Sequence, residues 1–296
     1  MKSTPLISVI ITVFNRPQFI SQAIDSVLAQ TYKNYEIILV DDGSTNKNLK
    51  KVLEPYIKNK KIRCIYQKNT GLWGSRNTGI KNAEGEFIAF LDDDDLWLPK
   101  KLEKQVPLFK DKQVGLVYSG RYTFGEGKNK TDFNKCYKGW IFDKLLEDPF
   151  ITGSSTIVRK ECLKKVGLFK PYKFAQDYEL WLRISKKYKA DFVSEHLVKY
   201  RVHSTNISKK KKPKYVIWYL KNIFKRFDVP KEKQKIILSK TRSNFAFYKG
   251  YNYRKTNKYK ALFYYLISMY YTLQRNTTHD QILAIKKLFN GYYKNK

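Results

Sequence analysis

Four consecutive aspartates, Asp92 to Asp95, constrain this chain more than any other feature of its sequence. They follow the apolar run Phe87 to Leu91, which predicts a buried strand, and Leu96 and Trp97 come directly after them. Adjacent carboxylates repel one another, so a fold tolerates them at a strand end only near a cation or water. A solvated acidic turn is the simpler interpretation. Because ligands bind at the carboxyl ends of strands in open parallel sheets, where carboxylates also bind divalent cations, a site for a metal-bound diphosphate is the sharper hypothesis.

Strand-like and helix-like segments alternate through the first third of the chain. Apolar, β-branched runs predict buried strands, and apolar residues at helical spacing predict helices between them. The expected strands cover residues 7–13, 35–40, 62–66 and 87–91, and the expected helices cover residues 19–30, 48–57 and 75–83. This order predicts an α/β fold with a parallel, doubly wound sheet. Asp41 and Asp42 follow the second strand, so we expect them at the same edge of the sheet as Asp92 to Asp95.

The pattern becomes mixed after Pro99. We expect helices over residues 100–109, 160–166 and 176–187, strands over 114–118, 154–159 and 191–200, and Gly-rich loops over 120–139. Asp177 lies at or near the amino end of the last of these helices.

Positive charge is concentrated toward the C-terminus. The chain carries a net charge of +33, with 59 Lys and Arg against 26 Asp and Glu. Residues 205–296 hold 23 Lys and Arg and three acids, whereas residues 1–204 hold 36 and 23. The change falls at the lysine run Lys209 to Lys212. We therefore predict a catalytic domain over residues 1–204 and a basic, tyrosine-rich helical region over residues 205–296.

Several classes of protein lack their signatures here. No G-x-G-x-x-G follows the first strand, and neither a G-x-x-x-x-G-K-[ST] loop nor a G-x-S-x-G elbow occurs. Their absence disfavours dinucleotide-binding folds, P-loop NTPases and α/β-hydrolases. No secretory signal or uncharged apolar run of about 18 residues is present, and the three cysteines indicate neither disulfides nor a zinc site. We expect a cytoplasmic protein.

The basic region predicts a membrane contact. Tyr215 to Phe227 combines an apolar Trp, Phe and Leu stripe with basic residues, the composition of a helix lying in a membrane interface. We expect it, with Lys209 to Lys212, to attach the protein peripherally to an anionic membrane surface. Residues 245–273 predict two further helices around residues 252–257. The alternative is that these helices pack on the catalytic domain. No nucleic acid is expected as a partner, because no nucleic-acid-binding fold is recognisable.

Five short strings, taken in order, resemble family 2 glycosyltransferases of the GT-A fold. They are S-V-I-I-T-V-F-N-R at 8–16, V-D-D-G-S at 40–44, R-N-T-G-I at 76–80, F-L-D-D-D-D-L-W at 90–97 and Q-D-Y-E-L-W-L-R at 176–183. The resemblance spans about residues 6–204 and implies a Rossmann-like, mostly parallel sheet flanked by helices. It also implies sugar transfer from a nucleotide-sugar donor with inversion, assisted by Mn²⁺ or Mg²⁺.

The resemblance implies a nucleotide-binding role for residues near the first strands. Thr12 and Phe14 would line the nucleobase pocket, and Asp41 or Asp42 would accept hydrogen bonds from base or ribose; a turn and helix cap is the alternative for these two acids. Arg76 would contact the diphosphate from the start of its helix, where backbone N–H groups favour anions, or would be a surface arginine. The expected nucleotide-sugar-binding set is Thr12, Phe14, Asn15, Asp41, Asp42, Arg76, Asp92 and Asp93.

The acid run matches the family's D-x-D through Asp92 and Asp94. Asp94 would ligate Mn²⁺ or Mg²⁺ bridging the two phosphates, while Asp92 would hold ribose or a metal-bound water. Asp95 would have a supporting or an acceptor-side role, and Asp93, although in the nucleotide-sugar-binding set, has no specific role of its own. His203 resembles a family position near the diphosphate, where imidazole ligates metal or touches phosphate; a structural histidine is the alternative.

Asp177 matches the family's general base, which deprotonates the acceptor hydroxyl. A helix cap is compatible with that role. The family commonly has Glu at the preceding position, where this chain has Gln176, and a neutral amide would change the acceptor contacts. Trp181 would either stack on a sugar or pack in the core.

The sequence therefore predicts an inverting glycosyltransferase that moves a sugar, expected to come from a UDP-sugar, to a hydroxyl of a glycan or lipid-linked glycan. Its expected place is the inner face of the cell membrane, in cell-surface polysaccharide synthesis. Two alternatives stay open, which are sugar transfer to a polyprenyl phosphate and a non-catalytic membrane-bound scaffold.

Overall fold

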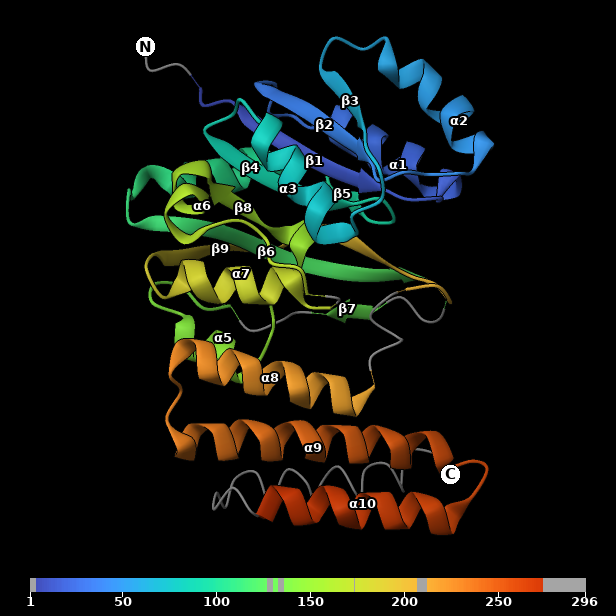
Figure 1. Ribbon diagram of the computed structural model, residues 1–296, viewed down its shortest axis with the longest axis vertical. Coiled ribbons are helices and arrows are strands. Elements are labelled where there is room, and N and C mark those ends of the chain that lie inside the picture. Colours follow the sequence, from blue (N-terminus) through green and yellow to red (C-terminus); the bar gives the residue numbers. More distant parts are fainter. Residues whose placement is uncertain (1–3, 127–129, 133–135, 173, 207–211, 274–296) are drawn as a thin grey trace. The chain divides into compact units, whose positions relative to one another are not determined.

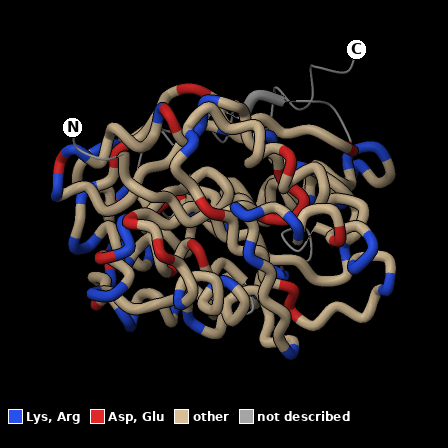
Figure 2. Tube along the Cα trace, turned by 90° about the horizontal axis from the view of Figure 1, so that it is seen from above, with Lys and Arg blue, Asp and Glu red and all other residues tan. Residues whose placement is uncertain are grey.

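The computed structural model describes residues 4–126, 130–132, 136–172, 174–206 and 212–273 (Figure 1). The chain divides into two compact units, Met1–Asn206 and Ile207–Lys296. Lysines and arginines are spread along much of the trace rather than confined to one segment (Figure 2).

The first unit is built on a mixed sheet. Its strand order is β3-β2-β1-β4-β8-β6-β9-β5, with β7 paired to β6. The strands are β1 (Ile7–Val13), β2 (Tyr35–Asp41), β3 (Ile62–Tyr66), β4 (Phe87–Asp92), β5 (Leu96–Trp97), β6 (Val114–Gly125), β7 (Lys130–Asp132), β8 (Ile157–Arg159) and β9 (Lys189–Val202). The strands β1 to β4 are mutually parallel, as the alternating pattern predicts. From β8 onward the sheet is mixed, because β8 runs antiparallel to both β4 and β6.

Helices and short turns connect these strands. They are α1 (Pro17–Leu28), α2 (Lys47–Ile57), α3 (Leu72–Asn82), α4 (Lys101–Gln105), α5 (Phe142–Glu147), α6 (Lys160–Val166) and α7 (Gln176–Ser185), with 3₁₀ turns η1 (Val106–Lys110) and η2 (Gly153–Ser155). Pro17 at the first turn suits the start of α1, and the Asn46 side chain accepts from the Asn48 amide to cap α2.

Two expectations for the second half of this unit are wrong. The segment 120–139 is not a loop throughout, because β6 continues to Gly125 and β7 pairs with it. The strand expected from Ser154 begins only at Ile157, because Gly153–Ser155 form the 3₁₀ turn η2 instead.

The two faces of the parallel strands are covered by different helices. Ile7, Val9 and Ile11 of β1 share one core cluster with residues of α1 and α2. On the opposite face α3 lies very close to β1, because a Cβ built on Gly79 would stand 2.5 Å from Ile10 Cγ2. Only glycine permits this approach without a shift of the helix. The alternating apolar residues of β1 therefore fix it as the centre of a three-layer arrangement.

The strand register places the site residues at one edge of the sheet. Thr12 of β1 lies opposite Asp92 of β4, and Val13 lies opposite Asp41 of β2. The acids of β2 and β4 thus reach the same carboxyl edge, but β1 separates them. Two strand spacings amount to about 10 Å, which suits a ligand of nucleotide size and not one shared cation.

The second unit contains three described helices, α8 (Pro213–Phe227), α9 (Lys231–Tyr253) and α10 (Lys258–Leu273). The expected break near residues 252–257 is confirmed, while α9 begins well before the expected Phe245. Ser243 Oγ lies 3.0 Å from Ser268 Oγ and 2.9 Å from Thr272 Oγ1, which ties α9 to α10. Within the described residues, no helix is both long enough and apolar enough to cross a bilayer.

Candidate active site

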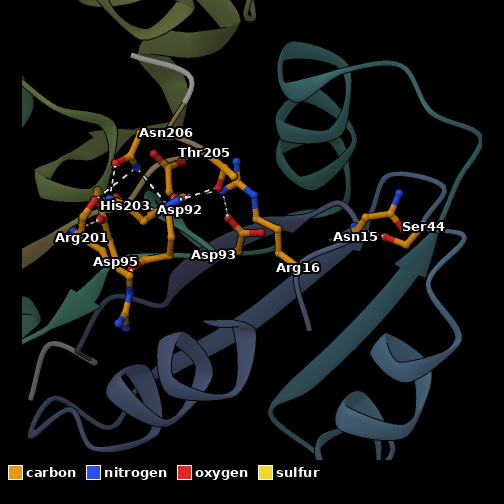
Figure 3. A network of polar contacts seen from close by, with 12 residues as sticks. Asn15, Arg16, Ser44, Asp92, Asp93, Asp95, Arg201, His203, Thr205 and Asn206 are labelled. Atoms are coloured by element: carbon orange, nitrogen blue, oxygen red, sulfur yellow. Dashed lines mark hydrogen bonds and ion pairs between the residues drawn. The ribbon is translucent and has the colours of Figure 1, made fainter. Parts of the chain in front are cut away.

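The four aspartates form a tight turn at the end of β4. The amide of Asp95 donates to the carbonyl of Asp92 at 3.1 Å, so the chain reverses within the acid run. Figure 3 shows Asp92, Asp93 and Asp95 at this turn, together with Arg16 and His203 among the residues around them.

Asp92 pairs with Arg76. The guanidinium Nη2 donates to Asp92 Oδ1 at 2.6 Å, and the arginine side chain is 5% exposed against 32% for the aspartate. The Arg76 guanidinium also lies 5.3 Å from the Phe169 ring centre. Since α3 begins at Leu72, Arg76 stands in the second turn of the helix and not at its start. The expected help from helix N–H groups is therefore wrong for Arg76, which acts through its guanidinium.

Asp93 and Asp94 share a second arginine. Arg16 Nη1 donates to Asp93 Oδ1 and to Asp94 Oδ2, both at 2.9 Å. Burial raises the pKa of Asp93 to about 8, with the neighbouring Asp94 and Asp92 adding to the rise and Arg16 opposing it. Arg16 is thus the cation that this structure provides for the middle of the acid turn.

Asp95 is fully engaged with the protein. Ser154 Oγ donates to its Oδ2 at 2.6 Å, and the Arg201 amide donates to its Oδ1 at 2.9 Å. It is 1% exposed, and burial together with Asp94 and Asp92 holds its pKa well above the usual range. Asp95 therefore stabilises the turn, and this position supports its neighbours rather than an incoming acceptor.

Both ring nitrogens of His203 have polar neighbours, and Asp94 is one of them. Its Nε2 lies 2.9 Å from Asp94 Oδ2 and 3.0 Å from Asn206 Nδ2, and its Nδ1 lies 2.7 Å from Thr205 Oγ1. Asn206 is oriented by the backbone, because its Oδ1 accepts from the His203 amide and its Nδ2 donates to the Arg201 carbonyl. When His203 Nε2 carries no proton, Asn206 Nδ2 donates to it; when Nε2 carries the proton, it donates to Asp94 Oδ2.

With Nε2 unprotonated, the His203 nitrogen and the Asp94 carboxylate oxygen are two ligand atoms that fit a divalent cation. The 2.9 Å between His203 Nε2 and Asp94 Oδ2 is close to the ~3 Å between neighbouring ligands of an octahedral cation with bonds of ~2.1 Å. Among the described residues, no three His, Cys, Asp or Glu side chains gather around one point. A cation at Asp94 and His203 would thus complete its coordination with water and substrate phosphate oxygens, as Mg²⁺ commonly does.

Asp177 lies beside Arg76 across a glycine. A Cβ built on Gly153 would stand 3.1 Å from Arg76 Nη2 and 3.9 Å from Asp177 Oδ2. Asp177 Oδ1 accepts from the amide of Tyr178 at 2.9 Å, whereas Oδ2 has no hydrogen-bond partner among the described residues. Gly153 of the turn η2 therefore lies close to both Asp177, the expected base, and Arg76, the partner of Asp92. The Asp177 oxygen on this side, Oδ2, is the one without a hydrogen bond.

The other two acceptor-side residues are turned into the protein. Trp181 is 1% exposed and packs near Phe90, with ring centres 5.9 Å apart. Stacking of Trp181 on a sugar is therefore wrong, because the apolar face of α7 that suggested it is the core face. Gln176 is also buried, and its Nε2 donates to the Tyr172 carbonyl at 2.6 Å.

The expected nucleobase residues lie at the end of β1. Thr12 is buried, whereas the Phe14 side chain is 46% exposed and free to stack. Asn15 adopts a left-handed conformation with φ 56°, which asparagine tolerates. Its Oδ1 accepts from the amides of Thr45 and Asn46 at 2.8 and 2.9 Å. Asn15 thus fixes the loop after β2, to one side of the acid turn (Figure 3).

Asp41 and Asp42 differ in availability. Asp42 is 3% exposed, and its two oxygens accept from the amides of Thr70 and Gly71 at 2.9 and 2.8 Å. It thereby holds the loop that leads into α3. Asp41 Oδ1 accepts from the Ser44 amide at 2.9 Å, and its other oxygen has no hydrogen bond within the described residues. Of the two, Asp41 is the acid able to receive a ligand.

Three residues of this site were missed by the sequence-based prediction. Arg16 stands in the string that resembles the family, but nothing nearby indicates that it reaches the acid turn. Ser154 comes from a segment that was expected to begin a strand, and Gly153 directly precedes that segment. The contact of Ser154 with Asp95 spans 59 residues of sequence, and a local pattern carries no signal for such a pairing.

The family is shown by comparison with known proteins. Residues 8–167 match the model of glycosyl transferase family 2. The chain belongs to this family and is a glycosyltransferase.

Two of the relatives are an uncharacterised glycosyltransferase and one whose name states its reaction. An uncharacterised glycosyltransferase of Rickettsia typhi is 34% identical over 75% of this chain and 74% of its own length. The Escherichia coli UDP-Glc:alpha-D-GlcNAc-diphosphoundecaprenol beta-1,3-glucosyltransferase WfgD is 34% identical over 70% of this chain and 81% of its own length. Other relatives are longer, and the chain spans 35% of a Rickettsia conorii glycosyltransferase to which it is 36% identical.

Solved structures show the same GT-A fold. Staphylococcus aureus TarS in complex with UDP-GlcNAc matches with a TM-score of 0.66 at 17% identity, over 98% of this chain and 92% of that one. The mannosyltransferase PcManGT from Pyrobaculum calidifontis, in complex with GDP-Man and Mn²⁺, matches with a TM-score of 0.59 at 16% identity, over 99% and 82%.

Proposed function

We propose that this protein transfers a sugar from a nucleotide-sugar, a UDP-sugar by preference, to a hydroxyl group of a glycan or lipid-linked glycan. The observation that carries the proposal is that the acid turn, Arg76 and Asp177 all lie close to the turn η2. Ser154 contacts the acid turn, and Gly153 lies between Arg76 and Asp177. A diphosphate side and a general base thus meet across one glycine, as a single displacement requires.

The donor side is formed by groups of opposite charge. Phe14 offers an exposed ring for the base, and Asp41 retains an oxygen for ribose. Arg76 pairs with Asp92, and its guanidinium would bind the diphosphate of the donor. Asp94 and His203 would hold Mn²⁺ or Mg²⁺, which when bound neutralises the charge of the leaving nucleoside diphosphate. The UDP-GlcNAc complex of TarS and the GDP-Man and Mn²⁺ complex of PcManGT support a nucleotide-sugar donor and a divalent cation.

The acceptor side is formed by Asp177. Its free Oδ2 would take the proton of the acceptor hydroxyl as that oxygen attacks the anomeric carbon. The attack comes from the face opposite the leaving diphosphate, so the configuration inverts. The other oxygen of Asp177 accepts from the Tyr178 amide in the first turn of α7, which leaves Oδ2 on the side of Gly153. WfgD, whose name gives a diphosphoundecaprenol-linked acceptor, supports a lipid-linked glycan.

The test is release of nucleoside diphosphate from a panel of UDP-, GDP- and dTDP-sugars, with Mn²⁺ or with EDTA. We expect one donor to be hydrolysed slowly without acceptor, and this release to be lost with EDTA or in Asp94→Asn. Asp177→Asn should bind the donor normally and lose transfer to a glycan hydroxyl by at least about a hundredfold. Transfer that survives in Asp177→Asn would favour a polyprenyl phosphate acceptor, which needs no base. Absence of both release and nucleotide binding would favour the scaffold.

A further inference from the structure

Helix α10 carries an apolar stripe that faces away from its helical partner. Leu262, Phe263 and Leu266 are 54%, 59% and 50% exposed, far more than large apolar side chains usually are. Exposed tyrosines stand on both sides of them along the helix, at Tyr259 and Tyr270. Spacings of three and four residues put these side chains on one face.

The opposite face of α10 is already satisfied by α9. Ala261, Tyr265, Ser268 and Thr272 are buried, and a Cβ on Gly250 of α9 would meet the Tyr265 ring at 2.9 Å. The two helices are therefore packed closely through small and polar residues. The stripe of α10 is not needed for this packing, so it is available for something else.

Helix α8, which the sequence marked as the membrane segment, is arranged differently. Its apolar residues Leu220, Ile223 and Phe224 are buried. Only two of its large side chains, Tyr215 and Trp218, are exposed to a similar extent as the α10 stripe, at 48% and 59%. The apolar side of α8 is thus mostly buried by packing within the protein. Of the two helices, α10 has the larger exposed apolar face.

Charge around the stripe favours an anionic partner. Residues 233–273 contain no Asp or Glu, and Lys255, Lys258 and Lys260 are exposed at the start of the stripe. A second copy of the chain would bring the same positive charge against this face. A soluble polyanion would satisfy the lysines and leave the leucines and the phenylalanine in water.

We propose that the α10 face, defined as Tyr259, Leu262, Phe263, Leu266 and Tyr270, docks on the surface of an anionic lipid bilayer. The helix lies in the interfacial plane, with its apolar side chains among the upper acyl chains and its tyrosines at the headgroups. The lysines at its start bind the anionic headgroups. This docking is independent of the donor chemistry proposed above.

The test is co-sedimentation of the full-length protein with vesicles of equal parts phosphatidylglycerol and phosphatidylcholine. The variant Leu262→Gln/Phe263→Gln/Leu266→Gln keeps helix-forming residues at exposed positions, so the hairpin should fold normally by circular dichroism. We expect its partition to vesicles to fall at least about tenfold, because three large apolar side chains lose their burial. The matched control Tyr215→Gln/Trp218→Gln, on α8, should bind like the parent protein.

Three results would overturn the proposal. One is equal sedimentation of the α10 variant and the parent protein, and another is a loss in the α8 control as large as in the α10 variant. The third is a parent protein that is dimeric in solution and becomes monomeric in the α10 variant without a change in vesicle binding, which would make the face a contact between copies. Donor hydrolysis should be the same in all three proteins, so a failed donor assay would count against the catalytic proposal and not against this one.

Discussion

Ser154→Ala tests whether η2 sets the geometry of the acid turn. The Ser154 hydroxyl is buried, donates to Asp95 Oδ2 at 2.6 Å and accepts from the Asp92 amide at 3.2 Å. Alanine leaves a buried carboxyl group and a backbone N–H without these partners. Each such loss costs about 1–3 kcal/mol, so we expect the free energy of unfolding to fall by about 3 kcal/mol. We also expect nucleoside diphosphate release to slow at least about tenfold, because the turn no longer holds Asp92 in place.

The neighbouring serine offers a matched control. Ser155 is equally buried, but its hydroxyl donates to the Thr152 carbonyl at 2.8 Å within the same turn and does not reach the acids. Ser155→Ala should cost about 1 kcal/mol and leave the release rate nearly unchanged. Urea denaturation and the release assay, run on both variants, separate stability from activity. If the two variants lose stability and activity equally, η2 does not position the acid turn and the reasoning is wrong.

Three further predictions concern the same turn. Since burial raises the pKa of Asp93 from 3.8 to about 8, the folded state favours its protonated form, and this contribution to stability is lost as the pH rises from about 4 to about 8. In EDTA, Asp93→Asn should therefore show a flatter dependence of unfolding free energy on pH than the parent protein; parallel curves would contradict this. Because Arg16 occupies Asp94 Oδ2, Arg16→Gln should bind Mn²⁺ more tightly in the absence of nucleotide, as measured by electron paramagnetic resonance; weaker or unchanged binding would refute the competition. Gly153→Ala should slow transfer at least about tenfold with little loss of stability, because its Cβ would stand 3.1 Å from Arg76 Nη2 and displace that guanidinium slightly; an unchanged rate would show that the gap is not used.

The fold of the first four strands could be predicted because their sequence pattern is strong. Runs such as 7–13 are β-branched and apolar on both faces, as strands buried in a parallel sheet must be. The second half gave weaker signals. A strand was expected over residues 154–159, yet the hydroxyls of Ser154 and Thr156 serve the acids and the 3₁₀ turn. In β6 the stretch Gly120–Thr123 was expected to be part of a loop, although pairing with β9 keeps it extended.

The site could be predicted only as far as local motifs reach. The acids, Asp177 and His203 stand in short strings with their own signatures. Arg16 and Ser154 reach the acids from 77 and 59 residues away in sequence, and no local rule indicates such contacts. The sequence also could not decide the role of Trp181, because an aromatic residue at helical spacing has the same pattern whether it packs in the core or stacks on a sugar.

The four aspartates have different surroundings, and we infer that they have different roles. Asp95 has both oxygens bound by the protein, and Asp93 is held by Arg16 in a site that favours its protonated form. Asp92 is the most exposed of the four and keeps one oxygen clear of Arg76, while Asp94 shares its oxygen between Arg16 and His203. The alternate members Asp92 and Asp94 are therefore the ones a ligand can recruit, and the other two keep the turn closed. Four carboxyl groups can stand at one strand end because two of them support the structure and only two are offered to the ligand.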